Sequence, residues 1–360
     1  MRDEIRVARR LIEAMPKAEL HLHLDGGLRP VTAIELAAER GIRPARSYTE
    51  MFHALVAPTH TANQAELLRY FELPVALLQD AAALRRVAVE LIEDKAADHV
   101  RYVEVKWAPA LHTRDGMSID EVIESVAAGT AEAAARHGVV ARLTVVAFRA
   151  STPAETAATA EAAVRHRDAG VSGFDLAGFE AEFPDPTPHL PAFDIARAGG
   201  LGVTVHAGEL VGGADLVRRA LAVRPDRIAH GAAAYTDPDL VAELAASGIT
   251  LDLCPTSNVQ AGLVPSIADH PLRALLLAGV DVTINTDDTT LSDVSLSDEL
   301  LACHTELGLS LADLWECTLH ALDVAFVDEP TRAALQDEFH AWAAHIPELH
   351  PRSGSRQAGR

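Results

Sequence analysis

The chain contains little cysteine and no long apolar run. Its three cysteines, Cys254, Cys303 and Cys317, include no Cys-x-x-Cys pair, which argues against a cysteine-rich zinc site. So few cysteines fit a reducing compartment, and we expect a cytoplasmic protein. Residues 1–16 are charged and amphipathic, so we expect no signal peptide there. The lack of apolar runs argues against a membrane span.

Positive charge is also in short supply. Against 52 acidic residues the chain carries 31 Lys and Arg, which gives a formal net charge of −21. Such a chain would repel the phosphates of a nucleic acid and the surface of an anionic membrane. We therefore expect neither as a partner, and a neutral or cationic small molecule as the ligand. The oligomeric state stays open.

Phosphate-binding signatures are absent as well. No G-x-G-x-x-G follows a predicted strand and no P-loop is present, which weighs against an open nucleotide-binding sheet. The chain instead alternates between strand-like and helix-like segments. The strand-like segments are residues 20–24, 100–106, 140–148, 171–176, 202–205, 227–230, 249–253 and 280–285. The helix-like segments are residues 31–40, 64–78 (interrupted by Pro74), 82–97, 118–136, 153–168, 192–198, 214–222, 238–246 and 271–277.

This alternation predicts a (β/α)8 barrel, the TIM-barrel fold, because regular β–α repeats form parallel sheets and the chain has room for insertions. Residues 41–63 read as an irregular or short-helical insertion after the first strand. The helical tail from residue 296 onward adds helices at the carboxyl terminus. We interpret residues 1–360 as one domain with its core at about 16–330. A doubly wound open sheet is the alternative.

The most informative short stretch is HLHLDG, residues 21–26. Its alternating leucines indicate a strand, in which His21 and His23 point to one face and the leucines to the other. Two imidazoles converging from one strand end are half of a metal site, because neutral histidine is the commonest metal ligand. Two unrelated histidines on a polar strand face are the alternative, which only residues further along the chain can decide.

Ligand-type residues recur at the ends of later predicted strands, where (β/α)8 enzymes place their chemistry. They occur in the stretches HAGE (206–209), RIAHG (227–231), CPTSN (254–258) and NTDD (285–288). A hydrolytic zinc site takes about three or four nitrogen or oxygen ligands and keeps a position for water. That set is available from His21, His23, His206 and one of the two aspartates Asp287 and Asp288.

Other residues at these strand ends would then be free to move protons. Zinc lowers the pKa of its bound water toward about 7, and Glu209, His230 and the second aspartate remain for proton transfer. His230 as a fifth ligand, or as a buried structural residue, stays open. Binuclear sites on similar barrels use a bridging lysine after strand four, where this chain has Asp175-Leu-Ala-Gly178. We therefore predict one metal ion.

The five stretches HLHLDG, HAGE, RIAHG, CPTSN and NTDD, in this order and spacing, resemble the adenosine deaminase family of the amidohydrolase superfamily. The resemblance covers residues 16–330. It implies a (β/α)8 barrel with one zinc ion, and an enzyme that hydrolyses adenosine or 2′-deoxyadenosine to inosine or 2′-deoxyinosine plus ammonia. Hydroxide would add to purine C6, and ammonia would leave the tetrahedral carbon. The partner molecule would be a purine nucleoside.

The resemblance also implies metal and proton-transfer roles. Zinc would be bound by His21, His23, His206 and Asp287. Glu209 would donate a proton to purine N1, which requires apolar surroundings that raise its pKa. His230 would orient and deprotonate the attacking water.

Four residues would contact the substrate by the same resemblance. Asp288 would hydrogen-bond purine N7 and help to position the hydroxide, so it counts as catalytic and as substrate-binding. Asp25 would meet the ribose 5′-hydroxyl, and the backbone at Gly178 would lie at N3. His23 would face the substrate as well as the metal.

Three departures from the family pattern concern the substrate. Phe179 follows Gly178 where the family usually has an acidic residue, and Thr289-Thr290 follow the aspartate pair where proline is usual. Residues 48–70, which would cover the sugar, correspond to a region that is variable in the family. Adenine deaminases of the same scaffold carry Glu in place of Asp25, so Asp25 favours a nucleoside.

Two further substrate classes place different demands on the site. A 5′-modified nucleoside such as aminodeoxyfutalosine, of menaquinone synthesis, would need a cation for its carboxylate, and the candidates are Arg149, Lys106 and Arg114. Nucleotides are not expected, because the chain is acidic and offers no glycine-rich phosphate cradle.

A catalytically inactive protein that binds zinc and nucleosides is the alternative from a different class. Against it, every position that matches a catalytic residue of the family is intact. The other zinc-deaminase pattern, H-x-E with P-C-x-x-C, is matched only at His304–Glu306 and lacks its cysteine half.

Overall fold

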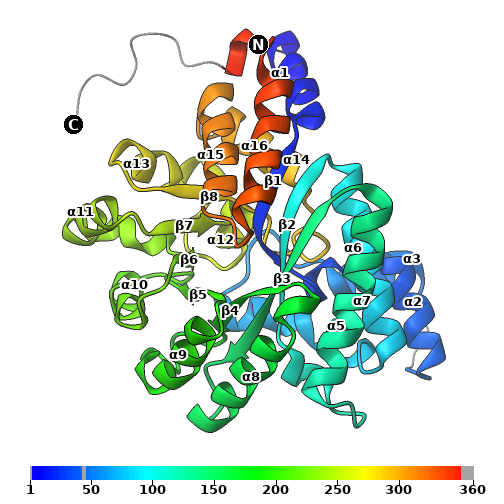
Figure 1. The fold of residues 1–360 in the computed structure, drawn as a ribbon. Coiled ribbons are helices and arrows are strands. Elements are labelled where there is room, and N and C mark those ends of the chain that lie inside the picture. Colours follow the sequence, from blue (N-terminus) through cyan, green and yellow to red (C-terminus); the bar gives the residue numbers. More distant parts are fainter. Residues whose placement is uncertain (1, 43–45, 350–360) are drawn as a thin grey trace.

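A computed structural model describes residues 2–42 and 46–349, in which eight parallel strands form a barrel ringed by helices (Figure 1). The strands are β1 (Lys17–His23), β2 (Val100–Trp107), β3 (Val140–Phe148), β4 (Val171–Ala177), β5 (Gly202–Ala207), β6 (Arg227–His230), β7 (Thr250–Leu253) and β8 (Val282–Ile284). Each strand pairs with the next in chain order, from β1 to β8. The predicted (β/α)8 barrel is confirmed, and the open doubly wound sheet is wrong.

The barrel closes between its first and last strands. The backbone N–H of His23 donates to the carbonyl of Asp287 (2.7 Å), and the N–H of Asp287 donates to the carbonyl of His21 (3.1 Å). The side-chain oxygen of Asn285 accepts from the N–H groups of Leu20 (2.8 Å) and His21 (3.1 Å). Closure therefore brings the HLHLDG and NTDD stretches side by side at one end of the barrel.

Helices form the outer layer and the additions to it. They are α1 (Arg2–Ala14), α2 (Pro30–Glu39), α3 (Tyr48–Leu55), α4 (Gln64–Leu68), α5 (Glu72–Leu77), α6 (Ala81–Ala97), α7 (Ile119–His137), α8 (Pro153–Arg165), α9 (Leu190–Ala198), α10 (Ala214–Ala220), α11 (Pro238–Ser247), α12 (Pro255–Gln260), α13 (Leu272–Leu277), α14 (Leu296–Thr305), α15 (Leu311–Asp323) and α16 (Glu329–Ala343). Capping boxes mark several helix starts in the sequence, as at Ser118 with Glu121 and at Thr152 with Glu155. Helices α1 and α14–α16 gather beside β1 and β8 (Figure 1).

The predicted insertion, residues 41–63, contains the short helix α3, while its residues 43–45 lie outside the described part of the chain; one of the helices predicted after it is divided. The segment 64–78 forms α4, a 3-10 turn at Arg69–Phe71 and α5. The break precedes Pro74, which lies in the first turn of α5, where its missing N–H costs no helical hydrogen bond. The chain before α4 is tied to the barrel end, since Thr61 N–H donates to the carbonyl of Gln260 (2.9 Å) and Ala57 N–H to that of Leu291 (2.8 Å). This segment therefore covers the end at which the barrel closes.

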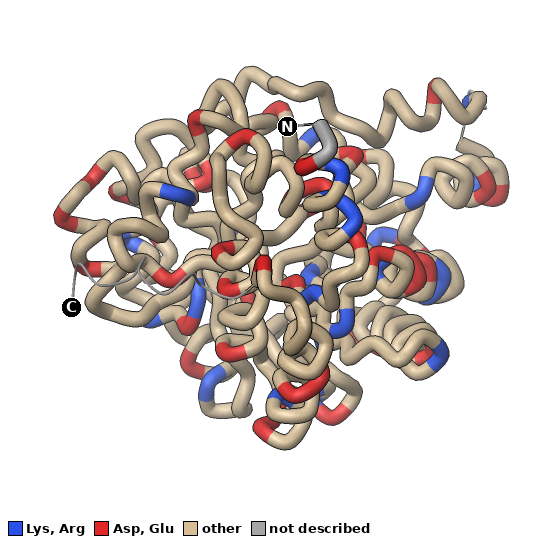
Figure 2. Tube along the Cα trace, turned by 90° about the horizontal axis from the view of Figure 1, so that it is seen from above, with Lys and Arg blue, Asp and Glu red and all other residues tan. Residues whose placement is uncertain are grey.

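Charge is spread over the whole molecule. Acidic residues lie all round the ring of helices, with basic residues interspersed among them (Figure 2). Several oppositely charged residues form exposed ion pairs, such as Arg85 with Glu132 and Arg218 with Glu243. Exposed ion pairs contribute little to stability. Within residues 2–42 and 46–349, no helix is long and apolar enough to cross a membrane.

Candidate active site

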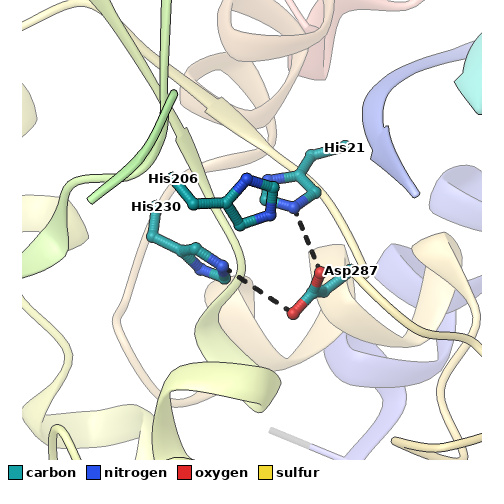
Figure 3. A group of neighbouring side chains, drawn as sticks. All are labelled: His21, His206, His230 and Asp287. Atoms are coloured by element: carbon teal, nitrogen blue, oxygen red, sulfur yellow. Dashed lines mark ion pairs between the residues drawn. The ribbon is translucent and has the colours of Figure 1, made fainter. Parts of the chain in front are cut away.

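Side chains from three strand ends and from the segment after β8 converge at one end of the barrel. Figure 3 shows His21, His206, His230 and Asp287 pointing toward one another, with one ligand atom of each lying within 4.8 Å of the others. His21 Nε2 lies 3.1 Å from Asp287 Oδ1, and His230 Nε2 lies 3.9 Å from Asp287 Oδ2. His23, whose side chain is partly exposed, belongs to the same cluster. The sequence-predicted ligands are thus brought together.

The spacing of these atoms fits a small cation. His23 Nε2 lies 3.2 Å from His21 Nε2, 3.2 Å from His206 Nε2 and 3.3 Å from Asp287 Oδ1. A tetrahedron with metal–ligand bonds of about 2.0–2.1 Å has edges of about 3.4 Å, close to these distances. Burial lowers the pKa of His21 far below its usual value and that of His23 to about 4, against the opposing pull of Asp287. Neutral rings with converging lone pairs are what a metal ion requires.

His206 is oriented by an aspartate that sequence reasoning missed. His206 Nδ1 lies 2.9 Å from Asp175 Oδ1, so Nδ1–H donates to the carboxylate and Nε2 faces the cluster. Lys106 Nζ and the Thr204 hydroxyl donate to the other oxygen of Asp175. Burial would raise the pKa of Asp175, but the charges of His206 and Lys106 hold it well below its usual range. The only signal in the sequence was the position of Asp175 near the end of β4.

Asp287 and His230 adopt unusual backbone conformations. Their φ angles are 64° and 65°, in the left-handed region that few residues other than glycine adopt. Each such residue costs on the order of 1–3 kcal/mol, and such residues cluster at functional sites. The hydroxyl of Ser257, in the CPTSN stretch, donates to Asp287 Oδ2 (2.7 Å) and holds the carboxylate in place.

A chain of directional hydrogen bonds determines which nitrogen of His230 carries its proton. The backbone N–H of Leu272 donates to His270 Nδ1 (3.2 Å), so a neutral His270 has its proton on Nε2, 3.0 Å from Asn258 Oδ1. The Asn258 amide can then donate to His230 Nδ1 (3.2 Å). Burial lowers the pKa of His230 to about 4, so its ring is neutral. A neutral imidazole carries one N–H proton, and Nδ1 of His230 accepts a hydrogen bond. The proton is therefore on Nε2, the nitrogen that faces Asp287.

Glu209 is a buried carboxyl beside the cluster. Its Oε2 lies 3.7 Å from His230 Nε2 and accepts from Gln64 Nε2 at 2.5 Å. Burial, and then the charges of Asp287 and Glu180, raise the pKa of Glu209 to about 8, although the Gln64 amide opposes this shift. The Glu180 carboxylate accepts from the backbone N–H of Glu209 (3.2 Å) and fixes the loop. Glu209 is therefore protonated near neutral pH, as its predicted role requires.

Gln64 and Glu180 were not predicted as site residues. Gln64 lies at the start of α4 and reaches Glu209 only because the covering segment lies over the barrel end. Glu180 follows the unusual Phe179, which is itself only partly buried. No periodic pattern in the sequence pointed to either contact.

The contact between Gln64 and Glu209 leads to a pH prediction. Because kcat/KM would require protonated Glu209, we expect it to fall as pH rises through a value no higher than about 8, since a bound metal cation would lower the pKa of the carboxyl. Gln64→Met keeps the shape but removes the amide that stabilises the carboxylate, so the fall should move to higher pH. Kinetics from pH 5 to 10 measure the shift, with the partly buried Gln336→Met, on the peripheral helix α16, as control. An unchanged profile in Gln64→Met would contradict this assignment.

Asp288 and its neighbour Gly26 pack closely. A Cβ on Gly26 would lie 1.8 Å from Asp288 Oδ1, so the site requires glycine there. Asp288 Oδ1 is buried and has no hydrogen-bond partner within the described parts of the chain. Burial, and then the charges of Asp287, Glu209 and Asp25, raise the pKa of Asp288 well above its usual value. An unpartnered buried carboxyl oxygen is suited to a ligand.

The remaining predicted substrate contacts border the same end. Asp25 is buried, with Oδ1 3.1 Å from His112 Nε2. Burial would lower the pKa of His112, but the charge of Asp25 more than offsets this and raises it. Gly178 has φ 116°, a conformation that favours glycine, at the end of β4. His23 is the most exposed of the metal-cluster side chains, at 14%, so it lies where substrate would enter.

Two of the three cations predicted for a substrate carboxylate have other partners. Lys106 is buried against Asp175. Arg149 donates to the carbonyls of His206 (2.6 Å) and Phe183 (3.0 Å). Arg114 has an exposed side chain, and its backbone N–H donates to Gln79 Oε1 (2.9 Å). These side-chain contacts explain the charges of Lys106 and Arg149 without a substrate carboxylate.

Comparisons with known proteins agree with this geometry. Residues 16–342 match the family described as adenosine deaminase. An adenosine deaminase of Mycobacterium sp. (strain KMS) is 40% identical over 345 residues, which covers 91% of this chain and 94% of that protein.

Two solved structures share the fold. An amidohydrolase from Burkholderia ambifaria with bound Zn is 30% identical, with a TM-score of 0.85 over 95% of this chain and 93% of that one. An adenine deaminase from Arthrobacter aurescens is 27% identical, with a TM-score of 0.84 over 92% of this chain and 100% of that one. With these likenesses over nearly its whole length, the chain belongs to the adenosine deaminase family.

Proposed function

We propose that the protein catalyses the zinc-dependent hydrolytic deamination of adenosine and 2′-deoxyadenosine to the corresponding inosines and ammonia. The observation that carries this proposal is the pairing of two features. Four ligand atoms lie together, with four of their six separations between 3.1 and 3.3 Å, and beside them stands a buried carboxyl, Glu209, whose pKa is raised to about 8. Family membership supports a hydrolase acting on the C6 amino group of purine nucleosides.

The metal set that we favour is His21, His23, His206 and Asp287, with one zinc ion. The fit rests on their converging nitrogens, of which those of His21 and His23 are kept neutral by burial, and on a carboxylate held by Ser257. His230 is less suited, because its Nε2 carries a proton and lies further from Asp287. The ion would supply an activated water by lowering its pKa toward about 7.

Proton transfer falls to Glu209. Protonated Glu209 would donate to purine N1, which makes C6 electrophilic, and its carboxylate would then accept a proton released by the attacking water. The same group would deliver that proton to the departing amine, so that ammonia leaves and the C6 hydroxyl proton restores Glu209.

His230 and Asp288 would orient the reacting groups. Since His230 Nε2–H points toward Asp287, it would donate a hydrogen bond that orients the attacking oxygen, rather than take up its proton. Asp288, whose raised pKa favours the protonated carboxyl, would donate a hydrogen bond from its buried, unpartnered Oδ1 to N7. The backbone at Gly178 would lie at N3, and Asp25 would meet the 5′-hydroxyl.

Ammonia release tests the proposal. Zinc-loaded protein is assayed with adenosine, 2′-deoxyadenosine, adenine, AMP and aminodeoxyfutalosine, and ultraviolet absorbance follows formation of the hypoxanthine product. We expect fast turnover of the first two. A preference for aminodeoxyfutalosine would indicate the same reaction on a 5′-modified nucleoside. A preference for adenine would indicate the activity named for the Arthrobacter protein. Zinc binding without turnover of any of the five would favour the non-catalytic alternative.

Two wider expectations belong with this proposal. We propose that residues 1–360 act as one catalytic domain. A cytoplasmic location agrees with the three cysteines, all of which are buried thiols.

A further inference from the structure

Three segments at the end of the barrel meet at Glu180. Its carboxylate accepts from two consecutive backbone N–H groups, those of Gly208 (2.7 Å) and Glu209 (3.2 Å), in the loop after β5. Its own backbone N–H donates to the side-chain oxygen of Gln64 (3.4 Å), at the start of α4. Glu180 itself follows β4 and is fully buried. It therefore joins the loops after β4 and β5 to the segment that covers the site.

Gln64 completes a closed ring of hydrogen bonds. A backbone N–H can only donate, so Oε1 of the Gln64 amide faces Glu180, and Nε2 faces the Glu209 carboxyl (2.5 Å). Exchanging the two amide atoms would set two N–H groups against each other. The ring returns from the backbone of Glu209 to the carboxylate of Glu180. The side chain and the backbone of Glu209 are therefore fixed by different segments of the chain.

The turn at Gly208 points the two N–H groups toward Glu180. Gly208 has φ 73°, in the left-handed region, and a Cβ at this position would lie 2.4 Å from the side chain of Val217. Successive backbone N–H groups in such a turn form a concave site for an anion. Here the carboxylate of the chain itself fills that site. The orientation of the loop that carries Glu209 is thus set by Glu180.

The position of Gln64 depends on the covering segment, residues 57–71, which is attached elsewhere at the barrel end. Thr61 donates to the carbonyl of Gln260 through its N–H (2.9 Å) and its hydroxyl (2.6 Å). Leu67 belongs to the same small apolar cluster as Leu291. These partners follow β7 and β8, whereas the Gln64 amide contacts the loops after β4 and β5. The amide therefore reaches these loops only while the covering segment lies across the barrel end.

We propose that Gln64 and Glu180 are positioning residues, which hold the Glu209 carboxyl in its reactive orientation while the covering segment lies across the barrel end. This inference rests on the proposed function, in which Glu209 transfers the protons. It gives the covering segment a part in the chemical step as well as in enclosing the substrate. A catalytic group displaced by about 1 Å can lose about 100-fold in rate. Loss of these contacts should therefore lower kcat rather than substrate affinity.

The test is a double-mutant cycle with Glu209→Gln. Gln64→Met keeps the length of the side chain but can neither donate to Glu209 nor replace the amide oxygen that faces Glu180. We expect kcat for adenosine to fall about 10-fold and KM to change by less than about 3-fold. Each variant is measured at its own pH optimum, so that a shifted pH profile does not contribute. In the Glu209→Gln background the same substitution should change kcat by less than about 2-fold, because the carboxyl that it positions is absent.

Two further variants accompany this cycle. Glu180→Gln sets an amide nitrogen against one of the two backbone N–H groups, so it should show the same loss of kcat and the same dependence on Glu209. It serves as the test if Gln64→Met does not fold. Gln336→Met, on the peripheral helix α16, is the matched control and should leave kcat and KM unchanged.

The outcomes separate this inference from the proposed function. Equal losses of kcat in both backgrounds would mean that Gln64 only supports the covering segment. An unchanged kcat in Gln64→Met, or a raised KM without a fall in kcat, would also overturn the inference. Failure of the wild-type protein to release ammonia from adenosine would instead refute the proposed function itself.

Discussion

Replacing His206 by alanine is expected to remove the bound metal and the deaminase activity together. His206 is held by Asp175 with Nε2 toward His23, so it contributes one corner of the four-atom set. Alanine leaves three ligands and a cavity that water can fill. The imidazole ring then no longer separates Asp175 and Lys106 from the metal site. Loss of one ligand from a small metal site typically removes most of its affinity.

Two measurements on the same sample check this result. Metal content is determined by elemental analysis after dialysis, and ammonia release is followed with adenosine. Activity should fall below about one-thousandth of wild type, since the activated water is lost. His340→Ala removes an exposed histidine and should retain both properties. Stoichiometric zinc in His206→Ala would contradict the ligand assignment.

Replacing Glu209 by glutamine should instead separate metal binding from catalysis. The amide has the same shape, and its oxygen can still accept from Gln64, so the loop and the metal cluster should persist. It cannot cycle a proton between water, N1 and the departing amine. We therefore expect kcat to fall by about 100-fold or more, with metal content unchanged.

The control for this variant is Glu306→Gln, at an exposed position after α14. Equal thermal midpoints of wild type and Glu209→Gln would show that the loss is chemical. Turnover near the wild-type rate in Glu209→Gln would contradict the proposed role of Glu209 in proton transfer.

Much of the fold could be predicted because local signals agree with it. The strands are short apolar runs between helices that start at recognisable caps, and parallel order follows from the alternation. The division of segment 64–78 was not predictable from local pattern. Pro74 marked an interruption, but the chain breaks at Arg69–Phe71, where the covering segment turns over the barrel end.

The candidate site was predictable only where its residues follow strand ends in short motifs. His21, His206 and Asp287 belong to such motifs, and the structure brings them together. Their supporting residues follow no such rule, because hydrogen-bond partners come from other elements at arbitrary distances along the chain. Lys106 illustrates this limit of prediction from sequence. The strand pattern gives its position but not its partner Asp175, so the sequence suggested a substrate carboxylate as its partner instead.

The closure of the barrel at Asp287 has a consequence for the protein without its metal. Two of the hydrogen bonds that join β1 to the segment after β8 link the backbones of His21 and His23 to that of Asp287, and these are the same residues proposed to bind the ion. Metal binding to the native state alone stabilises it by mass action, by about 4 kcal/mol at a thousandfold excess over Kd. Metal depletion would therefore weaken the seam between the first and last strands. An opened seam exposes two strand edges, which are sites for pairing with other chains. Shortage of the ion would thus favour aggregation as well as inactivity.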